Sequence, residues 1–221
     1  MLGPGAWEAV RFASRVVAGP AHAVGLWRAV TGGKAAGCQS PMPVPEILHA
    51  AGILPVRLSG AEISHPIRSC MDAWVSDRNG TFPTGIPGEK PRFGFPAGPF
   101  PDPASALDLL ESLAEWAGGL SGRPPTEGSL WKSIRAFRER EEWIRLLEER
   151  GRGGDRSLPE VGAADLVRAG NFLPPESHSR LLATVLRFSR PEVPVSPEEE
   201  KGDPLLVLSL RLHIHQAGGK P

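Results

Sequence analysis

A strand–helix–strand unit between residues 34 and 58 constrains the fold of this chain more than any other feature. Residues 34–39 predict a short strand, and Pro45 suits the first position of the helix that follows. Gly52 suits the residue after that helix, where a left-handed backbone costs little. The branched apolar residues at 53–58 predict a second strand. We therefore expect an α/β fold, with a partial Rossmann-like parallel sheet in the N-terminal half and a helical arm after it.

Helical patterns dominate the rest of the chain. Residues 1–31 predict helix with a break near Gly19-Pro20, and residues 66–78 predict a helical segment around Cys70. Further elements are predicted as helices at 103–118, 127–150, 159–169 and 175–188 and as a strand at 205–212. The expected domains are an N-terminal α/β domain (1–82), a proline- and glycine-rich linker (83–102), a helical arm (103–190) and a linker with a terminal strand (191–221).

Composition argues against several classes of function. The 221 residues include 25 basic and 25 acidic side chains, and no basic stripe is interleaved with aromatic residues, so nucleic acid and anionic membrane are not expected partners. No apolar run reaches the ~18 residues of a membrane span. The first thirty residues lack a clean apolar block before a cleavage site. A cytoplasmic protein is therefore expected.

Cys38 and Cys70 are the only two cysteines, too few for a disulfide scaffold. In a reducing compartment each is a buried thiol, a nucleophile or a metal ligand. Together with His49 and His65 they would make up a Cys2His2 zinc set. The wide spacings match no compact zinc motif, so this interpretation is the weakest.

The strand–helix–strand unit resembles the N-terminal motif of 2-hydroxyacyl-CoA dehydratase and benzoyl-CoA reductase subunits. The motif is a glycine-lysine strand ending in cysteine, a Pro-Glu helix, an Ala-Ala-Gly turn and a Pro-Val-Arg strand. The matching segments are GKAAGC at 33–38, PEILHAAG at 45–52 and ILPVRL at 53–58. Cys70 stands where the family has a second cysteine, and LPPESH at 173–178 is similar to a helix start in the family's helical arm.

The sequence departs from the family in two places. After Gly80 the family continues with an Asp-Gly strand, a Cys-Asp element and a tryptophan-containing helix, whereas this sequence passes directly into the proline-rich residues 83–101. Beyond the strand at 205–212 the family has a second α/β domain with a third cysteine, which this sequence lacks. We therefore expect a short, truncated member of the family.

The resemblance implies an iron–sulfur-dependent subunit. Family members bind a [4Fe-4S] cluster through three cysteines, and an ATP-dependent activator protein supplies one electron. An (R)-2-hydroxyacyl-CoA is reduced to a ketyl radical, loses its hydroxyl and becomes an enoyl-CoA; benzoyl-CoA reductases instead reduce an aromatic thioester. The implied partners are a second homologous subunit, the activator and the acyl-CoA substrate. Cys38 and Cys70 are the implied cluster ligands, an incomplete set.

The resemblance also implies a substrate pocket lined by Glu46 and His49, one helical turn apart, with Ser40 nearby. These residues have structural interpretations as well. The two cysteines could be unrelated buried thiols, Glu46 a first-turn carboxylate favoured by the helix dipole, and His49 a partly buried structural histidine.

Other polar residues have weaker support for a role. His178 is expected to be structural, and His213 and His215 are expected to be solvated. Arg57 could meet a CoA phosphate, although no glycine-rich phosphate loop accompanies it. Two functions stay open: a catalytic subunit of the dehydratase or reductase type, and a non-catalytic family member that acts as a binding or assembly module.

Overall fold

The computed structural model describes residues 4–39, 44–59, 65–77, 90–95, 102–152 and 160–188. The helices in these ranges are α1 (Pro4–Ala18), α2 (Pro20–Thr31), α3 (Pro45–Ala50), α4 (His65–Cys70), α5 (Pro103–Ser121), α6 (Glu127–Arg152), α7 (Glu160–Ala169) and α8 (Pro175–Phe188). The strands are β1 (Lys34–Gln39), β2 (Ile53–Leu58), β3 (Ala73–Asp77) and β4 (Arg92–Phe95). The predicted strand at 205–212 lies outside the described residues, as do His213 and His215.

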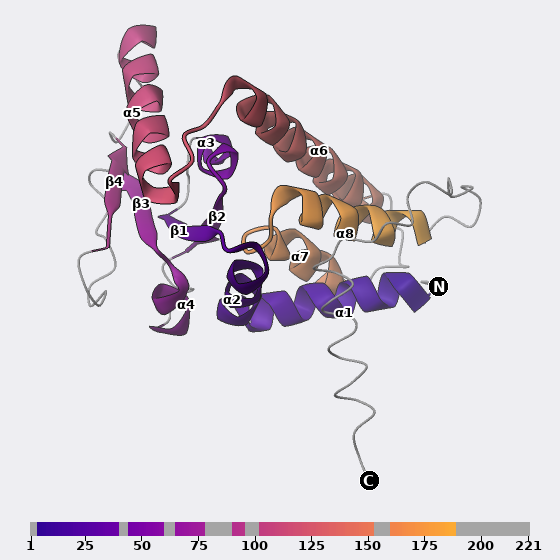
Figure 1. Cartoon of the computed structure of the whole chain (residues 1–221). Coiled ribbons are helices and arrows are strands. Elements are labelled where there is room, and N and C mark those ends of the chain that lie inside the picture. The colour runs from indigo at the N-terminus through magenta and orange to yellow at the C-terminus, as the bar shows by residue number, and fades with distance from the viewer. Residues whose placement is uncertain are drawn as a thin grey trace.

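The four strands form one parallel sheet in the order β2-β1-β3-β4, so the predicted α/β fold is confirmed (Figure 1). The central strand β1 pairs on both sides, and its Cys38 lies opposite Arg57 of β2 and Val75 of β3. The chain leaves β1 towards β2 and then returns to the other side of β1 as β3. This reversal makes a switch point between β1 and β3, the place where open α/β sheets bind ligands at the carboxyl ends of their strands.

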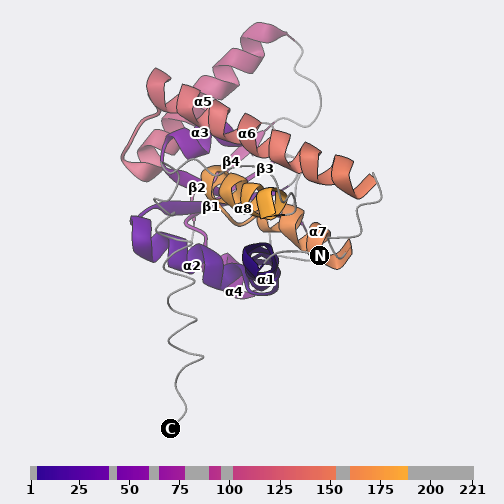
Figure 2. The same cartoon turned by 90° about the vertical axis from the view of Figure 1, so that its right-hand side faces the viewer.

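Two apolar cores cover the two faces of the sheet. The α1-side core contains Ala35, Leu54 and Trp74 from the sheet and packs them against α1, α7 and α8. The α3-side core contains Ala36 and Val75 and packs them against α3 and α5. Successive strand residues alternate between these cores, as the pleat requires. Figure 2 shows α1 and α2 on one side of the sheet and α3, α5 and α6 on the other.

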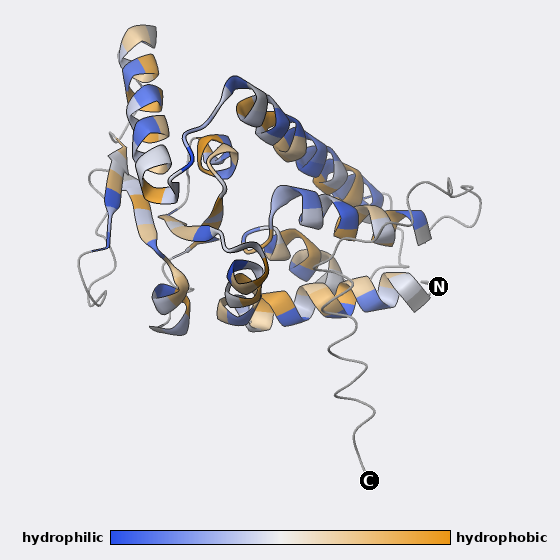
Figure 3. Cartoon of the chain, viewed as in Figure 1, coloured by the Kyte–Doolittle hydropathy of each residue, from blue (hydrophilic) through white to orange (hydrophobic). Residues whose placement is uncertain are grey.

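Several predicted helix boundaries are confirmed. The N-terminal helices break between Ala18 and Pro20. The Asp102 carboxylate accepts the Ser105 backbone N–H at 2.8 Å and caps α5. Thr126 Oγ1 accepts the Ser129 backbone N–H at 3.2 Å at the start of α6. Helix α6 has a hydrophilic outer side, where Arg145 pairs with Glu142 and Glu149, whereas its inner side is buried (Figure 3). None of the helices in the described ranges is long and apolar enough to cross a membrane.

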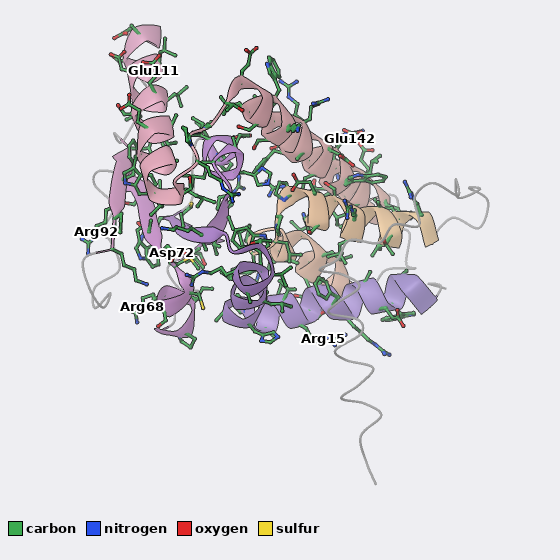
Figure 4. The ribbon with its side chains drawn as sticks, viewed as in Figure 1. Arg15, Arg68, Asp72, Arg92, Glu111 and Glu142 are labelled. Atoms are coloured by element: carbon green, nitrogen blue, oxygen red, sulfur yellow. The ribbon has the colours of Figure 1, made fainter. Side chains whose placement is uncertain are left out.

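The helical prediction for residues 66–78 is wrong in its second half. Helix α4 ends at Cys70, and β3 begins at Ala73. Asp72 enforces the break, because its carboxylate accepts the Ala35 backbone N–H at 2.9 Å and pairs with Arg28 at 2.7 Å. Figure 4 shows Asp72 where α2, α4 and the sheet meet. The Ala-Trp-Val run that follows, in which Trp and Val favour strands, is buried on both faces, which suits a central strand.

Two further boundaries differ from the prediction. The expected linker at 83–102 contains the edge strand β4, which pairs with β3 and contributes the buried Phe95 to the α3-side core. Helix α5 was predicted to end at Gly118, but it continues to Ser121, and Gly122 adopts the left-handed conformation at φ +71°. Gly118 instead permits close packing, since a Cβ there would lie 2.9 Å from the Cα of Pro124.

Candidate functional site

The side chain of His49 lies at the meeting point of three helices. Its Nδ1 is 3.0 Å from the Oγ of Ser133 on α6, and its Nε2 is 3.3 Å from a carboxylate oxygen of Glu176 on α8. The ring also packs edge-on against Phe137, with centroids 5.7 Å apart. The predicted site residue therefore connects α3 to the helices that follow the sheet.

The hydrogen-bond directions around His49 are fixed by Ser133. The Ser133 hydroxyl donates to the Glu46 carbonyl oxygen at 2.8 Å, so His49 Nδ1–H donates to the serine oxygen. Ser133 is only 1% exposed. A buried hydroxyl whose proton is committed to a backbone carbonyl is no nucleophile, so this Ser-His-Glu chain is a structural bridge.

The contact with His49 lowers the pKa of the Glu176 carboxyl. Burial on its own raises the pKa of the Glu176 carboxyl, but the hydrogen bond and the charge of His49 outweigh it. The pKa therefore lies below its ordinary value of 4.5. The pair is half-exposed on its carboxylate side, where ion pairs contribute little to stability. The contact therefore orients the imidazole more than it stabilises the fold.

Cys38 is fully buried beneath α3. It belongs to the α3-side core together with Ile47 and Leu48, and its thiol donates a weak 3.5 Å hydrogen bond to the Ala36 carbonyl oxygen. Burial raises the pKa of the Cys38 thiol to about 12, although the nearby positive charge of Arg57 opposes the shift. The side chain is therefore a neutral thiol, whereas metal ligation requires the thiolate.

Cys70 lies on the opposite side of the sheet. It ends α4 and packs against the α1-side core, where its Sγ is 3.5 Å from the Ala21 carbonyl oxygen. Its own carbonyl accepts a 3.0 Å hydrogen bond from Arg28, the residue that also pairs with Asp72. The structure thus places Cys70 in the junction of α2 and α4, away from α3.

These positions do not fit a cluster ligated jointly by Cys38 and Cys70. The sheet separates the two thiols, and the Cys38 thiol is neutral and enclosed by apolar side chains. Within the described ranges, no three His, Cys, Asp or Glu side chains gather closely enough to hold a metal ion. His65 begins α4, but its side chain is outside the described part of the chain.

Of the remaining predicted residues, the structure describes Glu46, which lies on α3. Ser40 follows directly after β1 but lies outside the described residues. Glu46 is half-buried in the first turn of α3, and its carboxylate forms no ion pair with another described residue. Its charge acts on Arg140 of α6. Of the predicted residues, the structure therefore brings Glu46 and His49 together and leaves the two cysteines apart.

Sequence reasoning missed Ser133, Arg140 and Glu176. The first two could have been noticed, because both interrupt the apolar stripe of α6 that includes Leu130 and Phe137. A polar residue in such a stripe needs a buried partner. Glu176 carried no comparable sign, since a carboxylate in the first turn of a helix is ordinary.

We expect Ser133→Ala to lower the free energy of unfolding by about 1–3 kcal/mol, because it removes the partner of His49 Nδ1 and the hydroxyl that donates to the Glu46 carbonyl. Urea denaturation followed by circular dichroism measures the change. Ser112→Ala on α5, where the hydroxyl is exposed and bonds only within its own helix, is the matched control. Equal stability of the Ser133 variant and wild type would contradict the bridge.

No protein-family model matches this sequence, and no curated protein matches it significantly. The family resemblance consequently rests on the motif residues of β1, α3 and β2 and on LPPESH at the start of α8.

Proposed function

We propose that this chain is a binding or assembly subunit related to the 2-hydroxyacyl-CoA dehydratase and benzoyl-CoA reductase subunits, and that it holds no [4Fe-4S] cluster on its own. The observation that carries the proposal is the separation of Cys38 and Cys70 by the sheet. A second homologous subunit is the proposed cytoplasmic partner, and an acyl-CoA thioester the proposed ligand.

The motif segments support the family part of this proposal. They fold as one unit, β1-α3-β2, with the two strands parallel and in full register from Lys34 and Ile53 onwards. Gly52 has φ +75°, the left-handed conformation that glycine adopts at little cost. Pro45 at the start of α3 and Gly52 after its end therefore have structural uses in this unit.

A catalytic dehydratase-type subunit is the second candidate, and one observation favours it. The Glu46 carboxylate forms no ion pair with another described residue. Its helix, α3, begins beside the carboxyl edge of β1. An uncommitted carboxylate at that edge is available for proton transfer to a bound ligand. In this case the cluster ligands would have to come from elsewhere in the complex.

Anaerobic reconstitution with iron and sulfide distinguishes the two candidates. We expect the purified chain to retain less than about one iron and to show no charge-transfer absorption. Neither the iron content nor the absorption is expected to change in Cys38→Ala or Cys70→Ala. About four irons per chain, lost in the Cys38 variant but not in a Ser112→Ala control, would instead establish a cluster-bearing subunit.

The binding part of the proposal needs its own measurement. Co-expression with a homologous subunit that carries three cysteines, followed by size-exclusion chromatography, is expected to give one complex containing both chains. If the two chains elute separately, with and without an acyl-CoA thioester present, the assembly role is excluded.

A further inference from the structure

Arg140 is a buried cation that forms no ion pair with any carboxylate in the part of the chain that the structure describes. The residue is only 7% exposed, on the inner side of α6, and its guanidinium lies over the Phe137 ring at 4.5 Å. One terminal nitrogen donates a stretched 3.5 Å hydrogen bond to the Gly170 carbonyl, and Nε has no hydrogen-bond partner among the described residues. A single distant carbonyl cannot neutralise a buried charge, which is costly when unpaired.

Arg57 adds a second positive charge to the same place. It stands near the carboxyl end of β2, and strand alternation puts it on the face of Ile53, which is the face covered by α3. Its backbone N–H donates at 3.0 Å to the Asn171 carbonyl, the residue after the one that Arg140 contacts. Neither arginine forms an ion pair with any described carboxylate.

The charges of the two arginines act on each other. Burial and, to a smaller extent, the positive charge of Arg57 lower the pKa of Arg140 to about 10, while the charges of Glu141 and Glu46 oppose the shift only in part. An anion between the two guanidinium groups would remove this repulsion. The planar donor fork of arginine matches the paired oxygens of a carboxylate or phosphate group.

We propose that Arg57 and Arg140 form a binding site for an oxyanion, the phosphate or carboxylate group of a small ligand, at the carboxyl end of β2. The position agrees with the general location of ligands in open parallel sheets. The site is inferred from the charges of this chain and is independent of the proposed family and of any cluster.

Isothermal titration with inorganic phosphate, and separately with acetate, tests the site at constant ionic strength set with sodium chloride. We expect saturable binding of at least one anion by the full chain, weakened about tenfold by Arg140→Gln and by Arg57→Gln. Arg138→Gln is the matched control, because it removes an exposed charge from the same helix. Binding of phosphate alone identifies a phosphoryl ligand, and binding of acetate identifies a carboxylate.

Thermal unfolding by circular dichroism accompanies each titration. If Arg140→Gln does not fold, the Arg57→Gln variant, whose replaced side chain is only partly buried, decides the outcome. Failure of both anions to bind wild type saturably would overturn the site. Equal weakening in Arg138→Gln would overturn it too, since the anions would then respond only to net charge.

Discussion

Replacing Trp74 with alanine is expected to lower the free energy of unfolding by about 3–5 kcal/mol, the largest effect of any single substitution considered. Trp74 is the largest fully buried side chain and lies in β3 at the centre of the α1-side core. Its ring covers Gly37 of β1 so closely that a Cβ there would be 2.6 Å from it. Strands β1 and β3 both pack closely against this ring, so truncation leaves a cavity that cannot close locally.

Two companion variants make the Trp74 measurement specific. Trp131→Ala on α6 removes a side chain that is 55% exposed and is expected to change stability by less than about 0.5 kcal/mol. Trp74→Phe is expected to cost less than alanine, because the buried indole N–H has no partner among the residues that the structure describes and phenylalanine removes it. Chemical denaturation measures all three. A loss below about 1 kcal/mol in Trp74→Ala would show that β3 is not central to the fold.

The strand–helix–strand unit could be predicted because the residues that begin and end its helix act locally. Pro45 starts α3 and Gly52 ends its turn at positive φ, and both effects depend only on the residues themselves. Strand β3 was missed because the break at Met71-Asp72 contains neither glycine nor proline. Asp72 stops the helix through Ala35 and Arg28, which are distant in sequence.

The opposite placement of the two cysteines follows from the missed strand. The chain moves from β1 to β2 in one direction and from β2 to β3 in the other. Since such crossovers are right-handed, the two connecting helices, α3 and α4, cover opposite faces of the sheet. Cys38 points towards α3, and Cys70 ends α4. Because strand β3 was not predicted, the sequence spacing of Cys38 and Cys70 did not indicate that they lie on opposite faces of the sheet.

The polar neighbours of α3 could be predicted only in part. Glu46 and His49 share one turn of the same helix, so their proximity is a local property. The contacts that define their roles come from Ser133 and Glu176, which lie far along the chain. Such contacts depend on how α6 and α8 pack against α3, and this packing is decided by the whole core rather than by a motif.

Lowering the pH from 7 to 4 is expected to destabilise the protein by about 3 kcal/mol through His178 alone. The imidazole is fully buried in α8, and its Nε2–H donates to the Leu166 carbonyl at 2.7 Å. Burial lowers the pKa of His178 from 6.5 to about 4; the hydrogen bond opposes this shift, and the charge of Arg140 adds to it. The other ring nitrogen, Nδ1, packs against Gly170 and has no hydrogen-bond partner in the described ranges.

The sign of the pH effect follows from which state binds the proton. Between pH 6.5 and pH 4 the unfolded chain protonates His178 while the folded chain does not, so acid favours unfolding over this window. His178→Gln keeps a donor for Leu166 but does not titrate, and urea denaturation from pH 7 to pH 4 is expected to show a loss about 3 kcal/mol smaller than in wild type. His22→Gln on α2, exposed to solvent, is the control for losing a histidine elsewhere. Identical pH dependence in wild type and His178→Gln would mean that His178 is protonated equally in both states, and that the junction of α7 and α8 admits water.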